Sequence, residues 1–249
     1  MEARRRDLRK FLAAMFLACP WLPLQAQSLR FGGELALSSQ LVDQGLAITP
    51  ATPILQASMA WTSPGGWSLG VAGGVELRAP GQPVLVLGRA SHAWALSEDW
   101  MGQASLLYYD YRARRGVAIP DRVDANLYFT YRDLLSIGVT AMRPVDGPRQ
   151  QLLGAADIEL NYPLSRHLSL AAGAGIAQAS IRAYGPHAYG AGYPGRYAVE
   201  SYGFGSLGLA WTSGRLRLQL DRNLNSLGNR RAYGSEGPRD WVATASWRF

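Results

Sequence analysis

The chain has 249 residues and a net charge of +7, but only 17% of its residues are charged, while 48% are hydrophobic. After Lys10 all basic residues are arginines, and they are scattered along the chain rather than gathered in one patch, which argues against a nucleic-acid-binding protein. One cysteine cannot form a disulfide framework, and the three histidines show no metal-binding spacing. We therefore expect no metal and no cofactor, and look for function in the pattern of apolar and polar residues.

The first 26 residues have the pattern of a secretory signal peptide. Basic residues precede an apolar run at 11–24, and the small residue Ala26 ends the segment. The run is too short, and too interrupted by Pro20 and Pro23, to cross a bilayer as a helix. Cleavage there leaves 27–249 as one domain, whereas a second interpretation places a lipoprotein cleavage site before Cys19. No transmembrane helix is predicted elsewhere.

From residue 27 onward, apolar and polar residues alternate in twelve segments. In the clearest of them, Leu216, Leu218 and Leu220 alternate with Arg217 and Gln219. A period of two predicts β-strands with one apolar and one wetter face, and most segments have the nine to eleven residues that a tilted strand needs to cross a bilayer. The expected strands are 30–41, 54–61, 67–77, 84–94, 100–111, 122–131, 135–142, 151–162, 168–181, 197–211, 215–221 and 241–249.

The connectors between these segments alternate in length. Those after even-numbered strands are short and rich in turn residues: 62–66, 97–99, 132–133, 163–167 and 212–214. Those after odd-numbered strands are mostly longer: 42–53, 112–121, 143–150, 182–196 and 222–239. Short turns on one side and long loops on the other are typical of outer-membrane barrels, in which the short side is periplasmic.

Aromatic residues mark the strand ends next to the short turns. Amphipathic rings suit a membrane interface, so these residues are predicted to form a girdle: Phe31, Trp61, Trp67, Trp94, Trp100, Tyr131, Tyr162, Trp211 and Trp247. The segment 241–249 resembles the closing strand of bacterial outer-membrane barrels, whose last aromatic residue is read by the barrel-assembly machinery. That resemblance implies an assembly signal made of Trp241, Trp247 and Phe249.

Charged residues on the face opposite the apolar one are predicted to line the barrel lumen, because an arginine on the lipid face costs about 2–4 kcal/mol at the midplane. They form either an ion-pair network that fills a narrow barrel or charge rings that select small solutes. These residues are Glu34, Glu76, Arg89, Asp124, Asp157, Glu159, Glu200, Arg215, Arg217, Asp221 and Arg248.

The N-terminal third resembles the Gcw_chp type, a family of uncharacterised proteobacterial exported proteins. Its members show Ser-x-Tyr-x-x-Arg-Gly on the first strand, of which Ser39 and Gly45 match the ends, while Leu41 replaces the tyrosine and Gln44 the arginine. The later Pro-x-x-Gln, the aromatic-Gly turn and the tyrosine-rich strand end are matched by Pro53, Gln56, Trp61, Gly66, Trp67 and residues 108–111. The resemblance implies a barrel and leaves its activity open.

The sequence therefore predicts an all-β protein with a single antiparallel transmembrane β-barrel of about twelve strands, or ten as the alternative, in the outer membrane of a Gram-negative bacterium. The expected partners are outer-membrane lipids, the barrel-assembly machinery and small polar solutes that cross passively. The alternatives are a plugged interaction barrel and a lipid-modifying enzyme in which His92 works with a serine such as Ser105. A soluble β-sandwich is the rival fold.

Overall fold

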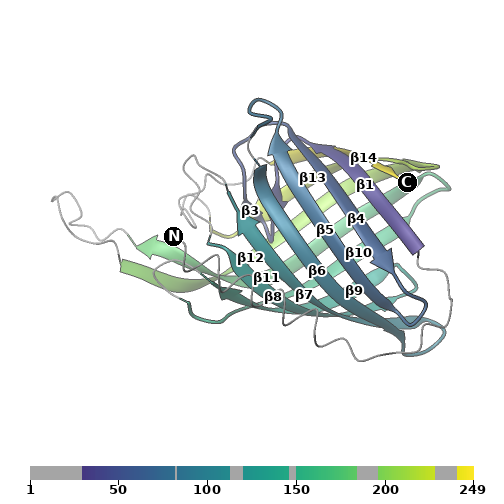
Figure 1. Ribbon diagram of the computed structural model, residues 1–249, viewed down its shortest axis with the longest axis horizontal. Coiled ribbons are helices and arrows are strands. Elements are labelled where there is room, and N and C mark those ends of the chain that lie inside the picture. The colour runs from purple at the N-terminus through teal and green to yellow at the C-terminus, as the bar shows by residue number, and fades with distance from the viewer. Residues whose placement is uncertain (1–29, 82, 113–119, 146–149, 184–195, 228–239) are drawn as a thin grey trace.

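The computed structural model describes residues 30–81, 83–112, 120–145, 150–183, 196–227 and 240–249. Twelve antiparallel strands close into one barrel, in which each strand pairs with its neighbour along the chain and the first pairs with the last (Figure 1). They are β1 (Arg30–Ser38), β4 (Ile54–Thr62), β5 (Trp67–Glu76), β6 (Pro83–Ala95), β7 (Trp100–Tyr111), β8 (Arg122–Tyr131), β9 (Leu135–Pro144), β10 (Leu153–Pro163), β11 (Leu168–Ala183), β12 (Arg196–Ser213), β13 (Leu216–Asn225) and β14 (Trp241–Arg248).

The predicted fold and the count of twelve barrel strands are confirmed, and a single closed sheet replaces the two packed sheets of a sandwich. The segment predicted as a signal peptide, 1–26, lies outside the described residues. No helix of the length and apolarity needed to span a membrane occurs in the part of the chain that the structure describes.

The alternation of residues produces an apolar outside and a more polar inside. On β5, Trp67 is 60% exposed and Leu69 is 59% exposed, whereas Ser68 and Ala72 between the outward residues are half-buried. Because paired residues on neighbouring strands share a face, the same division continues around the barrel. The molecule thus presents an apolar belt to its surroundings.

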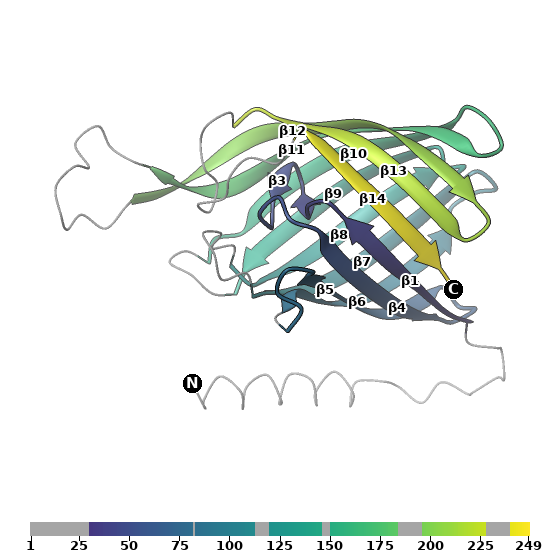
Figure 2. The same cartoon turned by 90° about the horizontal axis from the view of Figure 1, so that it is seen from above.

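The two ends of the barrel differ as the connector lengths predict. The short hairpins gather at the end where Phe249 lies, and β11 and β12 project from the opposite end (Figures 1 and 2). One short turn is built from Arg132 and Asp133, both at positive φ, which matches the twist of a tight hairpin. Arg132 reaches Asp99 in the next short turn at 2.6 Å, and the hydrogen bond to that carboxylate raises the pKa of Arg132.

The connector predicted as an external loop at 42–53 is instead partly folded into the barrel, so that prediction is wrong. Its residues form a small antiparallel hairpin of β2 (Val42–Asp43) and β3 (Leu46–Ala47), with Gln44 and Gly45 at positive φ in the turn. Ala47, Ile48 and Thr49 are at most 3% exposed. The apolar residues of this connector are buried against the inner wall, which explains why it does not extend into solvent.

The barrel closes where β1 pairs with β14. The register sets Glu34 opposite Arg248, and their side chains form an ion pair at 3.0 Å. Beyond the strand, Phe249 exchanges backbone hydrogen bonds with Gly33 at 3.0 and 3.1 Å. A Cβ on Gly33 would lie only 2.5 Å from the Phe249 ring, so the ring lies over a position where glycine leaves room for it.

Candidate functional site

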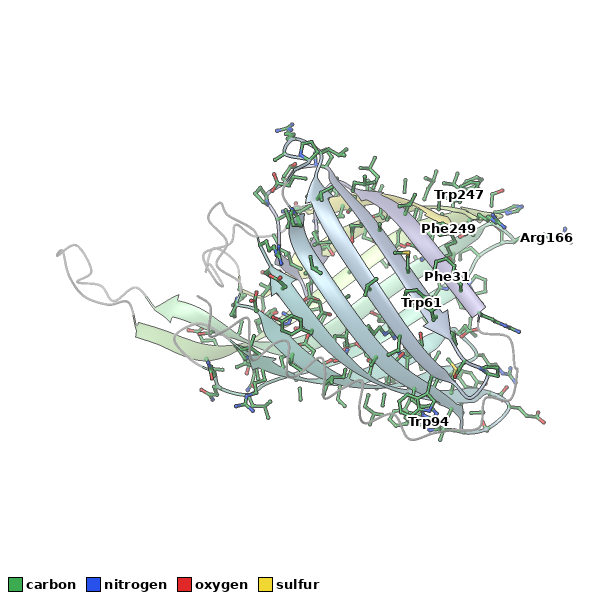
Figure 3. All side chains as sticks on the ribbon, in the orientation of Figure 1. Phe31, Trp61, Trp94, Arg166, Trp247 and Phe249 are labelled. Atoms are coloured by element: carbon green, nitrogen blue, oxygen red, sulfur yellow. The ribbon has the colours of Figure 1, made fainter. Side chains whose placement is uncertain are left out.

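The predicted girdle residues lie on strands at the short-turn end, and several of their rings touch. Phe31 contacts Trp61 with ring centroids 5.7 Å apart, and Trp100 contacts Tyr131 at 5.2 Å. Figure 3 shows Phe31, Trp61, Trp94, Trp247 and Phe249 towards the end of the barrel that carries Arg166. Trp67, Tyr162 and Trp211 are exposed there as well.

The three predicted assembly residues are all exposed on the outer face, but they do not lie together. Trp247 and Phe249 are at the short-turn end beside the closing strand pair, whereas Trp241 begins β14 at the opposite end. The three residues therefore mark the two ends of one outer strand face rather than one cluster.

The predicted lumen residues fall into three groups. Asp124, Asp157, Glu159 and Asp221 line one cavity. The others that lie on barrel strands occupy inner-face positions of the register away from that cavity: Glu34, Glu76, Arg89, Glu200, Arg217 and Arg248. Arg215 lies in the exposed turn before β13 begins, so the predicted strand starts one residue too early there.

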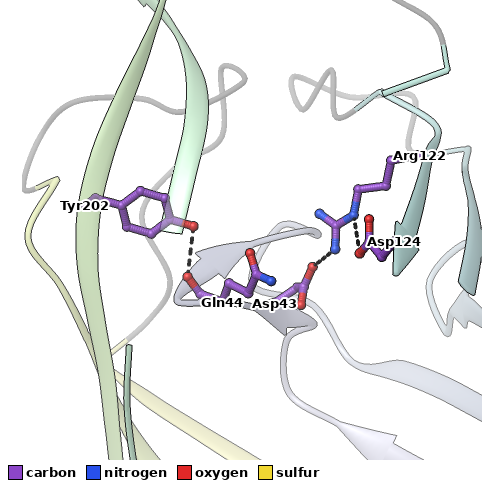
Figure 4. Close-up of polar contacts among 5 residues, drawn as sticks. All are labelled: Asp43, Gln44, Arg122, Asp124 and Tyr202. Atoms are coloured by element: carbon purple, nitrogen blue, oxygen red, sulfur yellow. Dashed lines mark hydrogen bonds and ion pairs between the residues drawn. The ribbon is translucent and has the colours of Figure 1, made fainter. Parts of the chain in front are cut away.

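The β2–β3 hairpin is fastened to the inner wall on two sides. The Tyr202 hydroxyl donates to the Gln44 carbonyl at 3.0 Å, and Asn225 Nδ2 donates to the Gly45 carbonyl at 2.9 Å. On the opposite side Arg122 pairs with Asp43 (Figure 4). The tip of the hairpin is therefore tied between β8 on one side and β12 and β13 on the other.

Arg122 is the centre of a polar cluster that joins the hairpin to the inner wall. Its Nε donates to Asp124 Oδ2 at 2.9 Å while its other nitrogen pairs with Asp43. Its guanidinium lies over the ring of Tyr109, 4.6 Å from the centroid, and 5.7 Å from that of Tyr111. Two carboxylates and two aromatic rings thus hold one guanidinium, which is the kind of contact for which arginine is suited.

An apolar patch of the inner wall completes the fastening. Leu46 of β3 packs against a buried cluster made of Met142, Leu153, Ala155, Ala177, Ala179, Tyr202 and Leu227. A cavity of only about 20 Å³ remains between the hairpin and this part of the wall, which is room for about one water molecule. The hairpin is therefore packed closely to one side of the lumen.

On the other side of the hairpin a cavity of about 430 Å³ remains open. It is bounded by the hairpin residues and by inner-face residues of β1, β4 and β7–β14. Among the described residues, five carboxylate side chains line it, from Asp43, Asp124, Asp157, Glu159 and Asp221, against one basic side chain, Arg122. We name this space the acidic cavity.

Some acceptors in the acidic cavity are buried and lack a hydrogen-bond donor. Asp124 Oδ1, Asn126 Oδ1 and Asp157 Oδ2 are such atoms among the described residues. By contrast, the second oxygen of each aspartate has a partner: Arg122 for Asp124, and the Tyr128 hydroxyl at 3.3 Å for Asp157. Asp221 accepts from Gln219 with both oxygens, and Gln219 in turn accepts from Arg217.

The residues considered for lipid chemistry are not brought together. His92 stacks on the outer face between Trp67 and Trp94, with centroids 4.6 and 5.8 Å away. Ser105 lies opposite Ser91 in the register of β6 and β7. Since Ser91 and His92 are adjacent and point to opposite faces of β6, Ser105 lies on the inner face and His92 on the outer face. Within the described residues, no group of three or more His, Cys, Asp or Glu side chains is placed to hold a metal ion.

The sequence interpretation missed Asp43, Arg122, Tyr109, Tyr202 and Asn225. Arg122 could have been predicted to point into the lumen, because it lies two residues before Asp124 and therefore on the same face of β8. For Asp43 the signal was weaker: a turn at Gln44 and Gly45 and the apolar residues after it indicate a hairpin, but not that it folds inwards.

No family model and no curated protein matches this chain. Among solved structures, the chain is similar to the NanC porin, with a TM-score of 0.52 and 9% identity, over 88% of this chain and 98% of that one. It is also similar to a protein from work on the in-meso crystallisation of membrane proteins, with a TM-score of 0.51 and 9% identity, over 88% and 83% of the two chains. At this identity the likeness concerns architecture alone. The chain has the fold of a porin-like outer-membrane β-barrel.

Proposed function

We propose that this protein is a non-enzymatic β-barrel of the Gram-negative outer membrane that gives small polar solutes a passive route. The apolar belt and the aromatic girdle support the membrane location, since lipid would cover the first and headgroups would meet the second. We also propose that residues 1–26 direct export, and that Trp247 and Phe249 are recognised during assembly. The resemblance to the Gcw_chp type fits this proposal.

The observation that carries the proposal is the acidic cavity beside the β2–β3 hairpin. Twelve strands enclose a lumen between the filled eight-stranded barrels and the open sixteen-stranded porins. Here the hairpin narrows that lumen from one side, and about 430 Å³ of space with polar walls remains. A narrowed polar passage suits selective diffusion of small solutes.

The test is single-channel conductance of residues 27–249, refolded in detergent and inserted into a planar bilayer. Heat-modifiable migration in a gel first checks that the barrel has closed. Discrete conductance steps are expected. A closed barrel without steps would contradict the passive route.

A second candidate is an interaction barrel with a plugged lumen. The fastening of the hairpin by Asp43, Gln44 and Gly45 supports it, because a plug must be held against the wall. In that case the closed barrel is silent, and only a variant without the hairpin conducts.

A further inference from the structure

We propose that the acidic cavity binds a small organic cation that carries a primary amine or a guanidinium group. The inference deepens the proposed function and rests on it for the route by which such a solute arrives. The binding itself depends only on the wall of the cavity.

Charge is the first argument. Arg122 is the basic side chain that lines the cavity, and it already pairs with both Asp43 and Asp124. One guanidinium charge is therefore shared between two carboxylates, while Asp157, Glu159 and Asp221 add three more carboxylates to the wall. A lumen wall with this excess of negative charge attracts cations and repels anions.

The unsatisfied acceptors are the second and independent argument. Asp124 is only 2% exposed, yet its Oδ1 has no donor, and neither have Asn126 Oδ1 and Asp157 Oδ2. Buried polar atoms are normally paired, and leaving an ionised one without a donor is costly. A cation with several N–H groups supplies the missing donors and the missing charge together.

The positions of these acceptors form one face of the wall. Asp124, Asn126 and Tyr128 succeed one another on the inner side of β8, and the register sets Tyr128 in the same row as Asp157 across β9. The Tyr128 hydroxyl donates to Asp157 Oδ1, which holds the carboxylate in place and leaves Oδ2 for the solute. Asp221 differs, because Gln219 already occupies both of its oxygens.

Size is the third argument. Pockets for small organic ligands have volumes of about 300–1,000 Å³, and the cavity measures about 430 Å³. An amine or guanidinium compound of modest length fits this space and can reach acceptors on β8 and β10 at once.

The test uses agmatine, which has a primary amine at one end and a guanidinium at the other, and glutarate as the anionic probe. Binding to the detergent-refolded barrel is measured by isothermal titration calorimetry. We expect saturable binding of agmatine and none of glutarate. In Asp157→Asn, agmatine should bind about tenfold more weakly, since a charged hydrogen bond is lost.

Controls separate the site from general charge. Asp99→Asn removes one carboxylate in a short turn and should leave agmatine binding unchanged. Asp124→Asn is the second variant, used if it still shows heat-modifiable migration, and should also weaken binding. Equal agmatine affinity in Asp157→Asn and Asp99→Asn would overturn the proposal, as would the absence of binding to the unaltered barrel.

Conductance distinguishes this inference from the proposed function. A silent barrel that binds agmatine through Asp157 contradicts the passive route and supports the site. A barrel that conducts but neither binds agmatine nor is blocked by it supports the route and overturns the site.

Discussion

At the scale of single residues, Arg122 joins parts of the chain that are far apart in sequence. It pairs with Asp43 of the hairpin and with Asp124 of its own strand, and it covers the rings of Tyr109 and Tyr111. Its side chain is 13% exposed and that of Asp124 is 2% exposed. Such a buried charge pair is costly to form, but removing one partner is costlier still because the other is left alone.

We therefore predict that Arg122→Gln lowers the free energy of unfolding by about 3–5 kcal/mol. The reason is that Asp124, which is buried, loses the guanidinium that pairs with its Oδ2. Denaturant unfolding of the refolded barrel in lipid vesicles measures the change. The matched control is Arg89→Gln on the inner face of β6, where the side chain is exposed and the expected change is within about 0.5 kcal/mol. Equal losses in the two variants would argue against the cluster.

At the scale of elements, the hairpin decides how much of the lumen is free. It is short and is fixed by side-chain contacts rather than by a ladder to the barrel. We therefore expect the twelve-stranded sheet to stay intact without it, since in the described part of the chain no barrel strand pairs with the hairpin.

Replacing residues 41–48 with a Gly-Ser linker of equal length should enlarge the single-channel step several-fold. In this variant no hairpin packs on the inner wall, so the part of the lumen that it occupied becomes available to ions. The control keeps the hairpin and carries a linker of the same kind at 79–82, between β5 and β6. Unchanged conductance in the first variant would show that the hairpin does not limit the passage.

The strands were predictable because each carries a long alternation, and most predicted boundaries lie within three residues of those observed. The greatest difference is four residues, at the end of β13, which was expected to end at 221 and continues to Asn225. In the first strand the expected 30–41 ends three residues early, at Ser38. The alternation continues past Ser38, but the chain turns inwards and Gln40 is bound to the Thr49 carbonyl at 3.0 Å. Two-residue strands such as β2 and β3 are too short for a period to be read.

The candidate site was only half predictable for the same reason. Parity along β8, β10 and β13 identified Asp124, Asp157, Glu159 and Asp221 as inward residues. The alternation shows which face a residue is on, but not which residues share one cavity. Their grouping depends on the tilt of the strands and on the place where the hairpin packs. The pairing of Asp43 with Arg122 spans 79 residues and leaves no local pattern.

At the scale of the whole molecule, closure depends on the pairing of β1 with β14. We predict that deletion of Phe249 lowers the yield of heat-modifiable barrel in the outer membrane, because its two backbone hydrogen bonds to Gly33 and its ring contact are lost together. Quantitative gels of membrane fractions measure the yield. An unaltered yield would contradict a role for this residue.

A second variant tests the same contact from the other strand. Gly33→Val should also lower the yield, since its Cβ would displace the Phe249 ring and press on the Ser58 carbonyl at 2.9 Å. Gly88→Val is the matched control on the outer face of β6, where a Cβ meets nothing within 4 Å. Its yield should equal that of the unaltered chain.

The position of this closing pair has a consequence for the time before the barrel exists. Glu34 and Arg248 are 214 residues apart, whereas the other barrel ladders join strands that follow one another. Until β14 arrives, β1 and β13 each have an open edge, and open edges are where separate chains stick together. Non-local pairing is also slow to form. Aggregation before closure is therefore a hazard that the topology builds in, and it lasts until the final strand pairing is complete.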